Sequence, residues 1–233
     1  MSDQRSASAP RKKGMFAYAA PMIVFVVLLG VSEGLKQPRA SSSWLSTPEF
    51  WIYPLQTLLC GALLIFFRRE YELHRVRRPI FVVAVALFVF LLWIAPQQFL
   101  HFPARRIGFN PDRWAAEPRL YWITLVLRFL RLVIVVPLVE EIFWRGLLLR
   151  YFVAENFEAV PFGAFSWPSF TIVTFAFALS HSVADWPAAL ITGALYNFVA
   201  YRTKSLSSCV LAHGLTNLSL GLWIMATGQW GFW

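Results

Sequence analysis

Two adjacent carboxylates and an arginine interrupt an otherwise apolar, helix-length stretch of the chain: Glu140, Glu141 and Arg145. Inside a bilayer each such charge costs roughly 2.5–3.5 kcal/mol on insertion scales, so three at one depth indicate a function. Glu141 and Arg145 stand four residues apart and can pair on one helical face. Glu140 is rotated by about 100° and has no local partner. The pattern predicts one clamped carboxylate and one that is available for chemistry.

Two histidines also lie inside apolar runs, each with a second residue four positions away. Phe177 precedes His181, and Asn217 follows His213. Each pair shares a helical face. Taken singly, a histidine or asparagine inside a span often forms only a helix–helix hydrogen bond worth ~0.6 kcal/mol. Phe177 taken singly is a packing residue that would form part of the wall of a substrate cavity. Together with the carboxylates they indicate a site, because intramembrane ionisable groups face one another in the bundle interior.

Hydrolysis without a metal needs a base that takes a proton from water and donors that hold an oxyanion. Glu140 fits the base, His181 can share or orient the same water, and His213 and Asn217 offer N–H donors. A metal bound by Glu140, His181 and His213 is an alternative, although the HExxH spacing of zinc proteases is missing. A dyad of Ser180 and His181 is disfavoured, because sequence neighbours do not face each other on a helix.

The composition indicates where these residues must sit. Of the 233 residues 58% are hydrophobic and 14% are charged, whereas a soluble domain has about 25% charged residues. The chain has 11 tryptophans and 22 phenylalanines, as membrane spans and their interfacial belts do. We expect an all-α, polytopic membrane helix bundle of about seven spans, with six to eight as the range, each of roughly 20 residues.

The apolar runs expected to span the membrane are 15–31, 50–67, 79–98, 131–152, 169–183, 186–202 and 206–227. They divide the chain into a basic solvated tail (1–14), accessory spans and loops (15–118), and a four-helix catalytic core (119–233). Cys60 and Cys209 lie inside these runs without CxxC spacing. We expect them to be buried thiols and not a disulfide or metal site.

The helix-compatible stretch 119–152 is too long for one span of roughly 20 residues. We expect Arg128 and Arg131 to mark its entry at the membrane interface, where long side chains reach the headgroups. Pro137 removes one helix hydrogen bond and is expected to kink the span. His181 lies near the end of its own run, so its span must begin deeper, or loop 153–168 must re-enter, for it to meet Glu140.

The net charge of +9 lies in short segments between apolar runs, which favours lipid headgroups and excludes nucleic acid as the partner. The tail, segment 68–78 and turn 202–204 carry most Lys and Arg residues and fall on one side of the membrane. The positive-inside rule therefore predicts a cytoplasmic N-terminus.

The three motif blocks resemble those of the CAAX-protease and bacteriocin-processing (CPBP, or Abi) family, which includes the type II CAAX prenyl endopeptidase. That family has EExxxR, FxxxH and HxxxN; this chain has Glu140-Glu141-Ile-Phe-Trp-Arg145, Phe177-Ala-Leu-Ser-His181 and His213-Gly-Leu-Thr-Asn217 in the same order. The resemblance covers roughly residues 119–227. It implies a membrane-embedded endopeptidase without a metal or cofactor, in which Glu140 and His181 activate water. It further implies that His213 and Asn217 hold the oxyanion and that the Glu141–Arg145 pair fixes the site.

The substrate implied is a peptide or protein cut near a membrane-anchored end, either prenylated and CAAX-like or carrying a sorting signal. The chain is also similar in general character to CAAX-protease-related proteins of bacterial exosortase systems, so we expect a bacterial inner membrane. One alternative is a non-catalytic binding, scaffold or peptide-immunity protein on the same fold. Another is a proton-coupled transporter with a Glu–His relay, but no internal repeat supports it.

Overall fold

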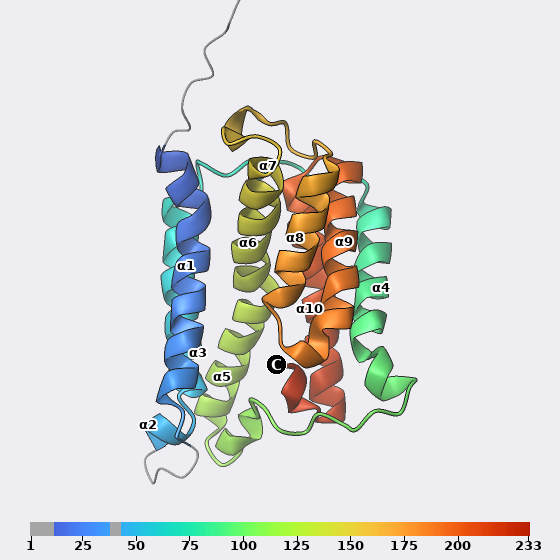
Figure 1. The fold of residues 1–233 in the computed structure, drawn as a ribbon. Helices are drawn as coiled ribbons and strands as arrows, with labels where there is room; N and C mark the ends of the chain where they lie inside the picture. The colour runs from blue at the N-terminus through green and yellow to red at the C-terminus, as the bar shows by residue number, and fades with distance from the viewer. Residues whose placement is uncertain (1–11, 38–42) are drawn as a thin grey trace, which may run out of the picture.

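The computed structural model describes residues 12–37 and 43–233, and all regular secondary structure in this part of the chain is helical (Figure 1). Most of the expected basic tail, residues 1–11, lies outside the described residues. The main helices are α1 (Lys12–Leu35), α3 (Glu49–Phe66), α4 (Pro79–Gln98), α8 (Trp167–Leu179), α9 (Trp186–Thr203), α10 (Leu206–Thr227) and one continuous helix over Pro118–Tyr151. The short ones are α2 (Ser43–Ser46), η1 (Pro111–Trp114), η4 (Phe157–Ala159), η5 (Val183–Asp185) and η6 (Trp230–Phe232).

Five helices of the described part are long and apolar enough to cross a membrane: Gly14–Leu35, Glu49–Phe66, Pro79–Gln98, Pro118–Tyr151 and Leu206–Thr227. The other two, α8 and α9, form a hairpin whose turn lies partway along the bundle (Figure 1). The expected helical membrane bundle is therefore confirmed. Two of its predicted spans are a hairpin, and α8 has only 13 residues.

The long helix does not divide as expected. It runs through α5 (Pro118–Leu130), the π-helical η2 (Arg131–Val135), α6 (Val136–Glu141), the π-helical η3 (Ile142–Leu148) and α7 (Leu149–Tyr151). The prediction that the side chains of Arg128 and Arg131 extend into the headgroups was wrong, because they are only 4% and 7% exposed. Arg131 Nε donates to Gln56 Oε1 at 2.6 Å. Both guanidinium groups lie over the ring of Tyr53, at 4.2 Å for Arg131 and 4.9 Å for Arg128. Partners on α3 thus replace the headgroups.

The helix continues through Pro137, directly after the π-helical turn. There the Val136 N–H donates to the Arg131 carbonyl, five residues back. In the same register residue 137 would donate to Leu132, but proline has no N–H. The Leu132 carbonyl instead accepts a hydrogen bond from Asn217 Nδ2 at 2.9 Å. The proline therefore leaves a carbonyl that ties the long helix to α10.

Apart from the α8–α9 turn, the helix connections described below lie on two opposite faces of the bundle (Figure 1). One face carries loop 67–78, loop 152–166 and the α9–α10 turn; Ser205 Oγ donates to the Arg75 carbonyl there at 3.1 Å. We call it the basic face, because segment 68–78 contains five arginines. The opposite face carries the α4–α5 connection and the C-terminal segment 228–233, and Gly231 N donates to the Arg105 carbonyl at 2.8 Å.

Helix α4 packs directly on the predicted core. Thr216 Oγ1 donates to the Ala86 carbonyl at 3.0 Å, and Trp93 Nε1 donates to Thr192 Oγ1 at 3.0 Å. These bonds join α4 to α10 and to α9. Part of the segment expected to be accessory therefore stands beside the four helices of the core. Cys60 and Cys209 are both free and buried, as predicted.

Candidate active site

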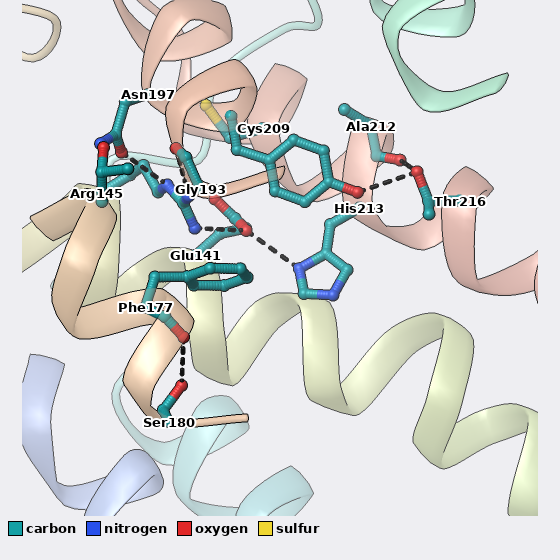
Figure 2. A network of polar contacts seen from close by, with 12 residues as sticks. Glu141, Arg145, Phe177, Ser180, Gly193, Asn197, Cys209, Ala212, His213 and Thr216 are labelled. Atoms are coloured by element: carbon teal, nitrogen blue, oxygen red, sulfur yellow. Dashed lines mark hydrogen bonds and ion pairs between the residues drawn. The ribbon is translucent and has the colours of Figure 1, made fainter. Parts of the chain in front are cut away.

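The Glu141 carboxylate is at the centre of a buried polar cluster (Figure 2). Arg145 Nη1 donates to Glu141 Oε1 at 3.0 Å, and both side chains are 0% exposed. The predicted pair is thus present. Arg145 also donates through Nε to Asn197 Oδ1 at 3.1 Å and through Nη2 to the Gly193 carbonyl at 3.2 Å. All three guanidinium nitrogens are used, so the arginine fastens the long helix to α9.

His213 joins this cluster from α10. Its Nδ1 lies 2.9 Å from Glu141 Oε1. A carboxylate can only accept, so Nδ1 carries the proton and Nε2 is the ring nitrogen left for other partners. The approach of α10 depends on Gly214, because a Cβ there would lie 2.9 Å from the Val133 carbonyl oxygen. The small residue after the histidine thus lets the two helices meet closely enough for the bond.

Glu140 has the opposite surroundings. It lines a cavity of about 380 Å³ together with His181, His213 and Asn217. It has no hydrogen bond or ion pair with any residue that the structure describes. The cavity is within the range of about 300–1,000 Å³ that ligand pockets occupy. The side chains predicted to handle water and the oxyanion therefore share one cavity, whereas Glu141 and Arg145 lie behind its wall.

His181 reaches the cavity because α8 is short. The helix ends at Leu179, and His181 follows in the turn to α9. Its Nδ1 lies 2.8 Å from the Phe177 carbonyl, which only accepts, so Nε2 keeps its lone pair. The rings of Phe177 and His181 are 4.7 Å apart. The difference in depth expected between His181 and Glu140 is thus removed by a hairpin that turns inside the bundle.

The argument against a Ser180–His181 dyad assumed a helix, and the chain is not helical there. Ser180 Oγ lies 3.3 Å from His181 Nδ1. Its hydroxyl nevertheless donates to the Phe177 carbonyl at 2.7 Å, the group that His181 Nδ1 also contacts (Figure 2). Both side chains are therefore turned to the same backbone oxygen, and the serine is not paired with a base.

The far end of the cavity was not predicted. Its wall includes Trp93, Arg105, Ser182, Asp185 and residues of the C-terminal segment. Arg105 Nη1 lies 2.6 Å from Asp185 Oδ1, and Ser182 Oγ donates to Asp185 Oδ2 at 2.5 Å. These residues come from separate parts of the chain, so no local pattern indicates them. Asn197, which is buried, was also missed. Its position inside an apolar run, four residues after Gly193, is visible in the sequence and could have indicated it.

The metal alternative needs three close ligands. Within 12–37 and 43–233, no group of three His, Cys, Asp or Glu side chains is placed to hold a metal ion. Glu140, His181 and His213 line one cavity but do not form such a group.

Residues 122–219 match a family model described as Type II CAAX prenyl endopeptidase Rce1-like. Over these residues the chain is similar to the Rce1-like family. The Rce1-like segment begins in α5, ends in α10 and contains all three motif blocks, so the resemblance seen in the sequence is confirmed. Together with the five membrane-length helices, this match indicates an integral membrane protein. No curated protein and no solved structure matches the chain.

Proposed function

We propose that this chain is an intramembrane endopeptidase with Glu140 as its general base. One observation carries the proposal: two adjacent carboxylates have opposite environments. Glu141 is fully buried and bound by Arg145 and His213. Glu140 lines the cavity and has no ion-pair partner among the residues with described positions. A carboxylate that is not already paired can take a proton from water.

In the proposed reaction Glu140 takes a proton from a water molecule in the cavity, and His181 Nε2 orients that water by accepting its other hydrogen. The water oxygen attacks the carbonyl carbon of the peptide bond, and the electron pair moves to the carbonyl oxygen. Donors aimed at this oxyanion lower the barrier. The C–N bond then breaks, and the proton on Glu140 passes to the leaving amine.

The oxyanion donors proposed are His213 and Asn217. Nε2 of His213 donates in the imidazolium form, in which both ring nitrogens carry a proton. One amide N–H of Asn217 is occupied by the Leu132 carbonyl, and the second N–H remains for the oxyanion. Glu141 and Arg145 do not line the cavity, so their role here is to position His213. No metal or other cofactor is needed in this scheme.

The proposed substrate is a peptide or protein cut near a membrane-anchored end, whether that end is prenylated and CAAX-like or carries a sorting signal. The proposed location is a bacterial inner membrane with the N-terminus in the cytoplasm. The family match supports a membrane-associated substrate, and the distribution of basic residues supports a cytoplasmic N-terminus.

The test is comparative proteomics of membranes from cells that carry wild type, Glu140→Gln or Glu117→Gln at matched expression. Glu117 is an exposed carboxylate outside the cavity, so its variant controls for the substitution itself. We expect new peptide termini near an anchored end with wild type and Glu117→Gln but not with Glu140→Gln. The same termini in all three would refute the mechanism and favour the non-catalytic binding, scaffold or immunity protein.

A further inference from the structure

The cavity extends from the middle of the bundle towards one face only. Beyond Asn217 its wall continues through Leu220 to residues 231–233 and to Arg105 and Asp185. Arg105 and residues 231–233 belong to the segments on the face opposite the basic face, and Asp185 lies in the α8–α9 turn beside them. No described residue of loop 67–78 or loop 152–166 lines it.

A second cavity adjoins the first one at its Arg105 end. It has a volume of about 460 Å³, is mostly lined by apolar residues and shares Trp93, Arg105 and Asp185 with the first. The adjoining turn is not covered by other parts of the chain, since Val183 is 71% exposed. Both cavities therefore meet at the face that carries the α4–α5 connection and the C-terminal segment.

The basic residues are concentrated on the other face. Its connections contain Arg68, Arg69, Arg75, Arg77, Arg78, Arg202 and Lys204, and α1 begins there with Lys12 and Lys13. The opposite face has the smaller set of Lys36, Arg105, Arg106, Arg113 and Arg119. Short connections rich in Lys and Arg stay in the cytoplasm. The basic face is thus the cytoplasmic one.

We propose that the cavity opens to the extracytoplasmic side of the membrane. This rests on the proposed function in treating the cavity as the place of cleavage. The substrates are then exported proteins or peptides whose membrane-anchored end emerges on the outer side. Prenylated proteins that remain in the cytoplasm are excluded, because their scissile bond would meet the closed, basic face.

Cysteine labelling tests the side of the opening without any catalytic assay. Cys60 and Cys209 are buried, so wild type gives a low background with a membrane-impermeant maleimide. Ala184→Cys places a thiol in the exposed turn beside both cavities, and Glu155→Cys places one in an exposed loop of the basic face. Neither variant removes a Lys or Arg residue, so the distribution of positive charge that orients the chain in the membrane is unchanged.

In spheroplasts we expect Ala184→Cys to be labelled at least tenfold faster than Glu155→Cys, and in inverted vesicles we expect the reverse. Slower labelling of Ala184→Cys than of Glu155→Cys in spheroplasts would overturn the proposal. Labelling after detergent solubilisation gives the total reactive thiol for each variant. In a Glu140→Gln background we expect each cysteine variant to be labelled at the same rate as in the wild-type background. The side of access is therefore decided even if no cleavage is found.

Discussion

At the scale of single residues, the motif predicted the different surroundings of Glu140 and Glu141 but not all of the contacts that produce them. Spacing alone shows that Glu141 and Arg145 can pair. The bond from His213 to Glu141 and the contacts of Arg145 with Asn197 and Gly193 join different helices, so no local pattern could show them.

Arg145→Met tests whether the buried cluster holds the bundle together. The substitution leaves Glu141 without its cation and Asn197 without its donor in a region with 0% exposure. Removing one partner of a buried pair typically costs about 3–5 kcal/mol. We expect the free energy of unfolding, measured by SDS titration, to fall by about that amount.

Arg113→Met is the matched control, because that arginine is exposed and lies outside the cavity. A loss for Arg145→Met no larger than the control's would show that the cluster contributes little to stability.

At the scale of the elements, the sequence predicted helix positions well because apolar length is a local property. Its errors arose where one helix meets another. Arg128 and Arg131 were expected in headgroups, but both lie against the ring of Tyr53 on α3, and Arg131 also donates to the Gln56 amide. The hairpin that brings His181 to the site could not be predicted, because the end of α8 depends on packing inside the bundle.

Gly214→Ala tests the contact between α10 and the π-helical turn. The added Cβ would lie 2.9 Å from the Val133 carbonyl oxygen, and overpacking of this kind costs about 1–3 kcal/mol. Separating the helices also stretches the bond from Asn217 to Leu132. We expect Gly214→Ala to have a lower stability in SDS titration and a lower cleavage rate than wild type. Gly61→Ala is the control, because a Cβ there meets nothing within 4 Å, and we expect it to be at least as stable as wild type. Equal behaviour of the two variants would argue against a tight contact.

At the scale of the whole molecule, segments distant in sequence line the far end of the cavity around Arg105. Its guanidinium contacts Asp185 at 2.6 Å and lies 4.5 Å from the centre of the Phe232 ring. Its backbone N–H donates to Gln229 Oε1 at 3.2 Å. Such an assembly depends on the full fold, which explains why the sequence predicted the end of the cavity lined by Glu140 and His213 and not this one.

Arg105→Gln is expected to loosen the C-terminal segment. The variant loses a charged hydrogen bond and the contact with Phe232, but the pair is partly exposed, so solvent screening reduces the effect. We expect backbone amides of 229–233 to exchange hydrogen several-fold faster in mass spectrometry, with the rest of the bundle unchanged. Arg106→Gln, an exposed neighbour, is the control. Unchanged exchange in Arg105→Gln would show that the segment is held by its other contacts.

The central claim is that Glu140 performs the chemistry while Glu141 supports it. The most direct test is turnover of one identified substrate by reconstituted wild type and Glu140→Gln, with the thermal stability of both measured in the same preparations. We predict that Glu140→Gln loses at least about 10²-fold in turnover, as expected for loss of a general base, while its melting temperature stays unchanged. Wild-type turnover by a folded Glu140→Gln protein would contradict the account.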